Sequence, residues 1–402
     1  MTAASTALQP VPADALSDRS CRASKFLVPE VIFGPGTLDE LGGAARRMGG
    51  GRALVVSDEG VMAAGWVERA LPSLTRADVG FHIWHELTPN PKDHEVLRGV
   101  DAFLAGGADM VVAIGGGSCI DAAKAIAVLS ANGGTVAQYA GIDRVPFPIP
   151  PLVMAPTTAG SGADVTQFCV ITDTVRGSKL TIAGRALVPN VSIIDPLVLA
   201  TMSESLTVYT GLDALSHAIE AYVSLAANFL SDVHALAAIG AVVEHLPAAV
   251  DRPGDLDALV GMARASFHAG LAFSSALLGA THAISHQIGG LTDLPHGLLN
   301  AILLPHVIRF NGAACPQRYG EVAGALGIPV WGMDGAEVVE ACADAVLLLG
   351  EKLGVPAGLR QLGVSEADIP HVVGLALEDA YITTNPRPVT AADVEQICRD
   401  AL

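Results

Sequence analysis

Three histidines between residues 281 and 297 have a spacing that could place them around one metal ion. His282 and His286 are four residues apart, so a helix would carry them on one face. His296 follows a Gly-Gly pair and a Leu-Pro turn, which are expected to break the helix and fold the chain back toward it. Neutral imidazoles suit Fe(II) or Zn(II). This stretch is therefore a candidate metal site.

A carboxylate and a fourth imidazole occur at the same spacing earlier in the chain, at Asp213 and His217. A single histidine on an apolar helix is more often an ordinary core or surface residue. Two such clusters within Ala-, Ile- and Leu-rich helices favour a metal site instead. Spacing alone does not decide whether His286, or Glu220 three residues after His217, is also a ligand. We expect Glu220 to form a salt bridge or to support a ligand.

A glycine-rich turn follows an apolar strand expected at residues 110–114, and a helix is expected from Asp121 to residue 129. Backbone amides at a helix start attract a pyrophosphate, and glycine lets the ligand approach closely. A tight strand-to-helix turn would need glycine in any case. The candidate cofactor residues here are Gly115, Gly116, Gly117, Ser118 and Asp121.

Two further places could contact the same cofactor. The loop at residues 156–162 contains Thr157, Thr158 and Ser161, which could hydrogen-bond a phosphate or a nicotinamide amide, or form a plain Ser/Thr turn. Asp58 directly follows an expected strand at residues 53–57. An acid there could accept both ribose hydroxyls of an adenosine and repel a 2′-phosphate, or it could cap a helix.

Length and composition indicate a two-domain globular protein. A chain of 402 residues exceeds the size at which one core keeps growing. Apolar residues make up 51% and charged residues 16%, and the net charge of −18 is spread without a basic cluster, which argues against nucleic acid or anionic membrane as partners. We expect a flexible leader at 1–25, an α/β dinucleotide-binding domain at 26–200 and a helical metal-binding domain at 201–402.

Localisation and assembly follow from weaker signals. The six cysteines include no CxxC pair, residues 1–20 lack the pattern of a secretory signal, and no uninterrupted apolar run reaches the roughly 18 residues needed to cross a bilayer. These features predict a cytoplasmic protein. A homodimer is expected only because homo-oligomers are common.

Strands and helices are expected to alternate in the first half of the chain, as in a parallel, doubly wound, Rossmann-like sheet. The expected strands lie at 31–33, 53–57, 81–84, 110–114, 152–155, 165–172 and 191–196, and helices at 37–48, 60–70 and 93–105. Beyond Pro196 only helices are expected, with breaks at Pro247, Gly289-Gly290 and Pro305 and a connection at 309–329. Ligands should then collect in the cleft between the two parts.

Four motifs in sequence order resemble those of the iron-containing, or group III, alcohol dehydrogenases. They are residues 115–121, 156–162, 210–220 and 281–297, and the similarity runs from about Phe26 to the C-terminus, including residues 300–306. The resemblance implies a dehydroquinate synthase-like architecture. It also implies an NAD-linked, metal-dependent enzyme that interconverts a small alcohol and its aldehyde.

The resemblance also assigns roles residue by residue. It implies that Asp213, His217, His282 and His296 bind Fe(II) or Zn(II), and that His286 lies beside the nicotinamide without binding metal. The loop at 116–118 would then hold the pyrophosphate of NAD(H), Thr157 and Thr158 would contact the cofactor, and Asp58 would favour NAD over NADP.

The substrate pocket and the type of activity leave alternatives open. Phe168, Phe273 and Tyr381 could narrow a substrate pocket or be ordinary core aromatics. A dehydroquinate-synthase-type lyase, which recycles NAD, would need basic residues for a phosphate-bearing substrate, and Lys179 and Arg185 are available. A non-catalytic nucleotide-binding subunit of an assembly is the third alternative.

Overall fold

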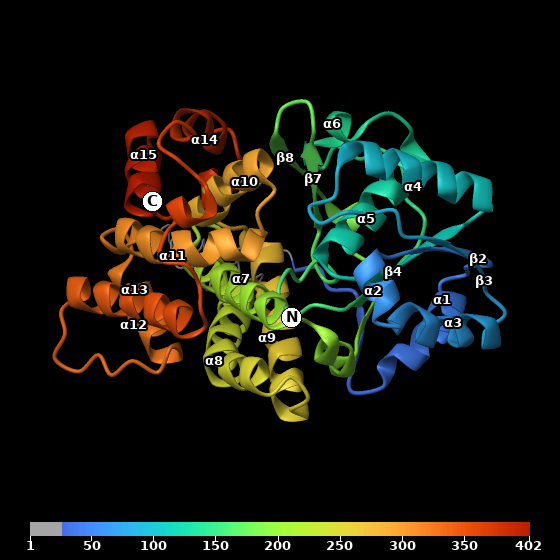
Figure 1. Cartoon of the computed structure of the whole chain (residues 1–402), viewed down its shortest axis with the longest axis horizontal. Coiled ribbons are helices and arrows are strands. Elements are labelled where there is room, and N and C mark those ends of the chain that lie inside the picture. Colours follow the sequence, from blue (N-terminus) through green and yellow to red (C-terminus); the bar gives the residue numbers. More distant parts are fainter. Residues whose placement is uncertain (1–25) are drawn as a thin grey trace, which may run out of the picture.

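The chain divides into an α/β part and a helical part that lie side by side in a computed structural model (Figure 1), which describes residues 26–402. The expected leader at 1–25, the region tested for a secretory signal and Cys21 lie outside the described residues. The α/β part is drawn in blue to green and the helices from α7 onward in yellow-green to red.

A six-stranded sheet forms the centre of the α/β part, and all of its strand pairs are parallel, as predicted. Its strands, in the order β1-β9-β6-β4-β2-β3, are β1 (Glu30–Phe33), β9 (Val191–Ile194), β6 (Leu152–Pro156), β4 (Met110–Gly115), β2 (Arg52–Val56) and β3 (Gly80–Trp84). Val55 and Val112 pack into one hydrophobic core, and their neighbours Leu54 and Val111 pack into another. Both faces of the sheet are therefore covered, which explains why its strands are continuously apolar.

The helices of this part differ from the predicted ones at several places, and α6 was not predicted. They are α1 (Leu41–Arg47), α2 (Glu59–Ala63), α3 (Trp66–Arg76), α4 (Asp93–Gly106), α5 (Gly117–Asn132) and α6 (Val136–Tyr139), with the 3-10 turn η2 (Thr37–Glu40) before α1. The single helix predicted at 60–70 is wrong, because Gly65 adopts φ 80° between α2 and α3. Helix α5 begins at Gly117 instead of Asp121, so the glycine turn itself forms the helix N-terminus.

A second, three-stranded sheet was not predicted in full. It has the order β5-β8-β7, with β5 (Gly141–Ile142), β8 (Ser178–Ala183) and β7 (Phe168–Asp173). Strands β7 and β8 form an antiparallel hairpin that pairs Phe168 with Ala183. The strand predicted at 165–172 starts three residues before β7, and β8 was not predicted, because its sequence has no clear apolar run. The turns η3 (Arg185–Leu187) and η4 (Pro196–Thr201) flank β9.

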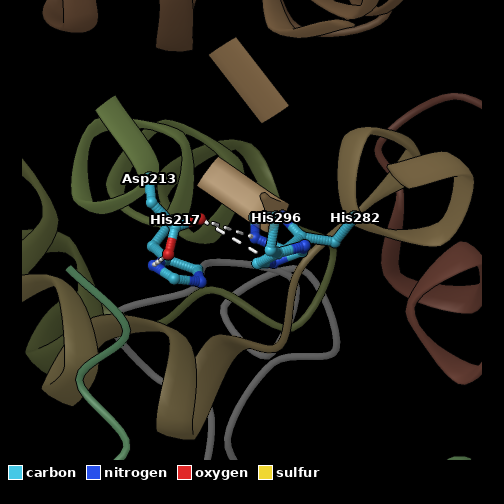
Figure 2. Close-up of side chains that lie close together, drawn as sticks. All are labelled: Asp213, His217, His282 and His296. Carbon is cyan, nitrogen blue, oxygen red and sulfur yellow. Dashed lines mark ion pairs between the residues drawn. The ribbon is translucent and has the colours of Figure 1, made fainter. Parts of the chain in front are cut away.

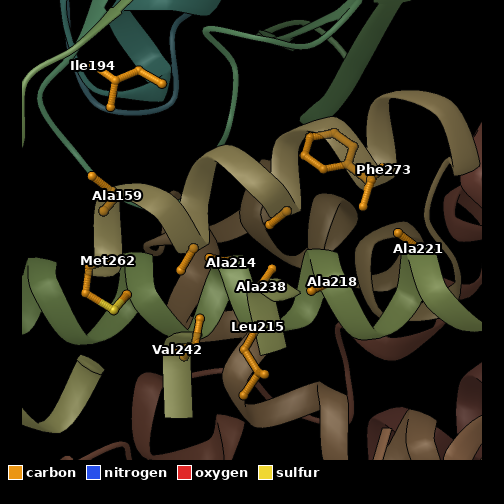
Figure 3. Packing of buried hydrophobic residues seen from close by; sticks show 14 of the residues in the cluster. Ala159, Ile194, Ala214, Leu215, Ala218, Ala221, Ala238, Val242, Met262 and Phe273 are labelled. Carbon is orange, nitrogen blue, oxygen red and sulfur yellow. The ribbon is translucent and has the colours of Figure 1, made fainter. Parts of the chain in front are cut away.

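No strand occurs between residue 195 and the C-terminus, all of which the structure describes. Helix α7 (Glu204–Val223) lies against α8 (Phe229–Asp251) and α9 (Leu256–Ala276). Small side chains at Ala214, Ala218 and Ala221 of α7 point into this packing (Figure 3). The remaining elements are α10 (Ala280–Thr292), α11 (His296–Gly312), α12 (Pro316–Ala325), α13 (Gly335–Lys352), η5 (Leu359–Leu362), α14 (Ile369–Ala376), η6 (Ala380–Thr384) and α15 (Ala391–Asp400).

Several predicted breaks in the helical part are wrong. Pro247 and Pro305 lie inside α8 and α11, and the segment 309–329, predicted as a connection, contains the end of α11 and all of α12. The Gly289-Gly290 pair continues α10. A Cβ atom on Gly290 would lie 2.8 Å from the carbonyl oxygen of Gly177, so glycine is needed there for close packing against the β7–β8 hairpin. Tertiary packing thus overrides these local breaking signals.

Helix α8 is the one described helix that is long and apolar enough to cross a membrane by length and composition. Its most apolar window has a mean hydropathy of 1.5, and a third of that window is buried inside the fold. It packs along both α7 and α9. This packing makes α8 a core helix of the folded chain.

Candidate metal and cofactor site

A cavity of about 1180 Å³ lies between the α/β part and the helical part and collects nearly all the predicted site residues. Gly115 is the exception, because it is buried at the end of β4, where a Cβ atom would lie 2.3 Å from the Cys119 Sγ. The predicted residues that line the cavity are Asp58, Gly116, Gly117, Ser118, Asp121, Thr157, Thr158, Ser161, Phe168, Asp213, His217, Phe273, His282, His286, His296 and Tyr381.

Four of these residues converge on one point. Potential ligand atoms of Asp213, His217, His282 and His296, here called the Asp/His cluster, all lie within 4.8 Å of one another (Figure 2). The Oδ1 atom of Asp213 is 3.9 Å from Nε2 of His282 and 3.8 Å from Nε2 of His296. Its Oδ2 atom is 3.9 Å from Nδ1 of His217. This arrangement could hold a single cation.

Three helices bring the Asp/His cluster together. Asp213 and His217 face the same way because they are one turn apart on α7. His282 comes from α10 and His296 from the first position of α11, after a turn in which Asp293 adopts φ 57°. A Cβ atom on Gly297 would lie 2.1 Å from the carbonyl oxygen of Tyr209, so glycine allows the start of α11 to approach α7.

Glu220 supports His282, as expected from its position on α7. Its Oε2 atom is 2.6 Å from Nδ1 of His282, and its carboxylate also accepts hydrogen bonds from the backbone amides of Gly279 and Thr281. Burial opposes ionisation of Glu220, but the bonds from His282 and Thr281 outweigh it and hold the pKa below its ordinary value. The hydrogen bond places the proton of His282 on Nδ1 and leaves the Nε2 lone pair directed at the cluster.

The burial and protonation of the cluster fit a divalent cation. His217 is buried, and burial lowers its pKa to about 4, with Asp213 offsetting part of the effect. Its Nδ1 atom is buried without a hydrogen-bond partner. A neutral imidazole with a free lone pair beside a carboxylate has the chemistry of a metal ligand.

Asn300 belongs to the same site, although no role was predicted for it. Its Nδ2 atom is 2.8 Å from Oδ1 of Asp213, 3.0 Å from Nε2 of His282 and 3.1 Å from Nε2 of His296. The signal that could have found it is its position four residues after His296, on the same face of α11.

His286 lies beside the Asp/His cluster but is not part of it. Its ring centroid is 6.1 Å from that of His282 and 5.2 Å from that of His296. Its Nδ1 atom faces Oδ2 of Asp379 at 2.9 Å. Burial lowers the pKa of His286, and the Asp379 carboxylate opposes this shift. The geometry therefore separates His286 from the four converging residues, which helical spacing could not do.

The two glycine-rich loops meet at the N-terminus of α5. A Cβ atom on Gly117 would lie 2.8 Å from both Cβ and Oγ of Ser161, and one on Gly116 would lie 3.1 Å from Cγ2 of Thr158. The Ser118 Oγ atom accepts a hydrogen bond from the backbone amide of Asn90 at 3.3 Å. Gly116, Gly117, Thr158 and Ser161, here called the glycine wall, leave backbone surface open to the cavity.

Asp58 caps a helix and lines the cavity as well. Its Oδ1 atom accepts the Val61 amide at 2.9 Å, so the alternative of a helix cap is confirmed. Its Oδ2 atom accepts a hydrogen bond from the Cys119 thiol at 3.0 Å. Because an ionised carboxylate has about four acceptor positions, these bonds leave room for a ligand.

Two charged groups that line the cavity have shifted pKa values. Burial lowers the pKa of Lys179 to about 8, and Nζ of this residue donates to Oδ1 of Asn90 at 2.9 Å. Burial also raises the pKa of Asp121 to about 7, with Lys124 opposing the shift. Lys179 was expected at the site only if the substrate carried a phosphate, because β8, the strand that brings it to the cavity, was not predicted.

Three aromatic side chains line the end of the cavity next to the Asp/His cluster. The rings of Phe168 and Phe273 stack with centroids 6.0 Å apart, and Tyr381 meets Phe168 edge-on at 6.0 Å. Phe273 also stacks on His217 at 4.4 Å, and Tyr381 lies 5.6 Å from His286. All three are buried, so they belong to the core and to the cavity wall at once.

Comparison with known proteins places this site in a family. Residues 29–196 match the family model for iron-containing alcohol dehydrogenase, and residues 207–402 match the C-terminal model of the Fe-containing alcohol dehydrogenase family. The chain is 40% identical to the 1,3-propanediol dehydrogenase of Klebsiella pneumoniae over 95% of its length and all of that protein's. It is 38% identical to the NAD-dependent methanol dehydrogenase of Bacillus methanolicus, over 94% of this chain and 99% of that one.

Structural comparison agrees. A crystal structure of 1,3-propanediol oxidoreductase superposes with a TM-score of 0.91 at 39% identity, covering 95% of this chain and all of that one. The predicted fold class and the oxidoreductase class are thereby confirmed. The full-length matches show that this chain belongs to the iron-containing alcohol dehydrogenase family.

Proposed function

We propose that this chain interconverts a small primary alcohol and its aldehyde with NAD, using a divalent metal held by Asp213, His217, His282 and His296. The observation that carries the proposal is the convergence of these four side chains at one end of a cavity whose other wall is a helix N-terminus with glycine-rich loops. Fe(II) or Zn(II) would reduce the free-energy cost of negative charge on the substrate oxygen, and NAD would accept or supply the hydride.

The protein residues around the substrate have separate tasks in this scheme. The Asp/His cluster would hold the cation, and Glu220 would keep the proton of His282 on Nδ1, so that Nε2 is free to bind the metal. The cavity wall would limit access of water to the reacting atoms. We assign His286 the transfer of the substrate hydroxyl proton toward solvent, because it adjoins the cluster without joining it. An imidazole is suited to accept and release a proton near neutral pH.

We propose that the nucleotide extends from the cluster toward Asp58. The N-terminus of α5, with Gly116, Gly117 and Ser118, would hold the pyrophosphate, since these residues line the cavity and free backbone amides at a helix start attract phosphate groups. Thr157, Thr158, Ser161 and Asp121 would contact the cofactor. Asp58 would accept the adenosine ribose hydroxyls and disfavour NADP. Gly115 would act through the shape of the turn, because it does not line the cavity.

The three aromatic side chains that line the cavity next to the Asp/His cluster favour a short substrate. Phe168, Phe273 and Tyr381 fill the space next to the cluster with large side chains, which leaves limited room beyond the reacting carbon. We therefore propose a short-chain primary alcohol or aldehyde as substrate. We also propose that the enzyme is cytoplasmic and acts as a homodimer. Sedimentation of the purified protein would test the homodimer.

The test is an NADH-linked screen of C2–C6 aldehydes and alcohols, with carboxylated, sulfonated and phosphonated members, on protein reconstituted with Fe(II) and separately with Zn(II). Net NADH consumption or production is expected with a short unbranched substrate. A lyase of the dehydroquinate-synthase type would show no net NADH change. No change in NADH with any compound of the panel and either metal would favour a non-catalytic binding protein.

The role of His286 has its own test. Replacing His286 with alanine should slow turnover and leave the metal content of the purified protein unchanged. A variant that loses metal as fully as a His282 variant would make His286 a ligand instead.

A further inference from the structure

His286 is paired with a buried acid from a distant part of the chain. Oδ2 of Asp379 lies 2.9 Å from Nδ1 of His286, although 93 residues separate them. Only 3% of the His286 side chain and 6% of the Asp379 side chain are exposed. Asp379 lies just before η6, which contacts α10, the helix that carries His286. Neither spacing nor any predicted motif placed this acid at the site.

Asp379 is itself held firmly. Its Oδ1 atom accepts the backbone amide of Tyr381 at 3.0 Å, which caps η6. Its Oδ2 atom also accepts a weaker bond from Nε2 of Gln287 at 3.3 Å. An ionised carboxylate only accepts hydrogen bonds, so Nδ1 of His286 must carry the hydrogen in this pair. In the neutral ring, the lone pair is then on Nε2, which is the nitrogen left for the cavity.

We propose that Asp379 is a positioning residue for the oxidoreduction, fixing the ring orientation and tautomer of His286 so that Nε2 faces the substrate oxygen. The inference rests on the proposed role of His286 and extends it. In alcohol oxidation the substrate O–H bond breaks and its proton passes to Nε2, while the hydride leaves the carbon for NAD. The reverse direction returns the proton from Nε2. A carboxylate behind an imidazole serves the same purpose in hydrolytic triads.

A purely structural role for Asp379, through the turn that carries Tyr381, makes different predictions. Asp379→Asn keeps an oxygen to cap η6 and presents an NH2 group to Nδ1 of His286. Two donors then face each other unless the ring changes tautomer, which would leave a hydrogen on Nε2 and remove its ability to accept the proton. The substitution therefore disturbs the tautomer and spares the cap.

The experiment compares Asp379→Asn, His286→Ala and the double variant in metal-reconstituted protein. We expect Asp379→Asn to lower kcat roughly 10- to 100-fold, with KM for alcohol and NAD within about twofold of the wild type. In the His286→Ala background the same change should have no further effect on kcat, because Asp379 acts through His286. Metal content and the thermal midpoint should stay near wild type.

Two further variants serve as controls. Glu378→Gln removes the same charge from the exposed neighbouring residue and should leave kcat unchanged. Asp379→Glu keeps a carboxylate and should retain more activity than Asp379→Asn, and it serves as the test variant if the asparagine protein does not fold.

The outcomes separate the inference from the proposed function. A loss in the double variant equal to the product of the single losses would show that Asp379 acts independently of His286 and would overturn the inference. A rise in KM with unchanged kcat would assign Asp379 to the Tyr381 turn and would also overturn it. If Asp379→Asn has a normal kcat and His286→Ala is slow, the positioning role of Asp379 is refuted and the proposed role of His286 stands. If His286→Ala has a normal kcat, the proposed role of His286 is refuted.

Discussion

The Asp/His cluster and the glycine wall face the same cavity but are built in opposite ways. The cluster consists of side chains on three helices, and one of them, His282, is held from behind by Glu220 at 2.6 Å. The glycine wall depends instead on two positions without a side chain, since a Cβ atom on Gly117 would lie 2.8 Å from Ser161. The first region depends on functional groups and the second on open backbone.

This difference implies two kinds of sensitivity. Removing a functional group from the Asp/His cluster should abolish metal binding and leave nucleotide binding at the glycine wall unchanged. Adding a methyl group to the glycine wall should weaken nucleotide binding and leave metal binding unchanged. The predictions below test this separation, beginning with the largest expected effect.

Replacing His282 with alanine should have the largest effect. The variant loses a proposed ligand and removes the imidazole that pairs with the buried carboxylate of Glu220. We expect loss of bound metal, measured by elemental analysis, and a fall in kcat/KM of at least roughly 1000-fold, or about 4 kcal/mol of transition-state stabilisation. NAD affinity, measured by fluorescence titration, should change little. A variant that keeps its metal would break the comparison.

Replacing Glu220 with glutamine tests the support behind the cluster. The amide keeps the shape of the side chain but no longer fixes the proton of His282 as strongly. Metal affinity, measured by competition with a chelator, should fall roughly 10- to 100-fold. Glu244→Gln is a matched control, because Glu244 is exposed on α8. Equal metal affinity in the two variants would contradict the role of Glu220.

Replacing Gly117 with alanine tests the glycine wall. The added methyl group meets Ser161, so the glycine wall must shift where the nucleotide would bind; a loss of about 1 to 2 kcal/mol of binding free energy would raise the Kd for NAD roughly 5- to 30-fold. Metal content should not change. Gly43→Ala in α1 is the control, since its Cβ atom would meet nothing closer than 3.7 Å. Loss of metal in the Gly117 variant would show that the two regions are coupled.

Replacing Asp58 with serine separates cofactor preference from helix capping. Serine is also a good N-cap, so α2 should persist. Loss of a charged acceptor for the ribose hydroxyls should raise the ratio of kcat/KM for NADP to that for NAD roughly tenfold. An unchanged ratio would remove Asp58 from the ribose site and leave it only its cap on Val61.

Asp121, which lines the same cavity, and His217 of the Asp/His cluster should respond to pH in opposite directions. Asp121 has a folded pKa of about 7, above its unfolded value, so the native chain binds more protons between roughly pH 4 and 7 and stability falls as pH rises through that window. His217, with a folded pKa of about 4, makes stability rise between roughly pH 4 and 6.5.

Urea unfolding of chelator-treated protein measures both slopes. The free energy of unfolding of Asp121→Asn relative to wild type should increase from pH 5 to pH 8, whereas that of His217→Asn should decrease from pH 4 to pH 6.5. The same slope for both variants would contradict the assignment of these shifts.

Local sequence patterns were sufficient for much of the fold and for the residue types of the site. The apolar runs of β2 and β4 and the i, i+4 pairs on α7 and α10 follow from strand and helix geometry, so they are visible within a few residues. The glycine turn before α5 is visible for the same reason. Breaking signals at Pro305 and Gly290 were misleading, because close packing holds the helices through them.

Only the tertiary structure could pair residues that are far apart in the chain. It separated His286 from the four cluster residues, placed Asp379 behind it, brought Asn300 to the Asp/His cluster and brought Lys179 to the cavity. The periodicity of a helix or strand tells which face a side chain occupies, but it carries no information about which distant element that face will meet. Such contacts depend on how the whole chain packs, and the hydrogen-bond partners of the site are therefore decided at that level.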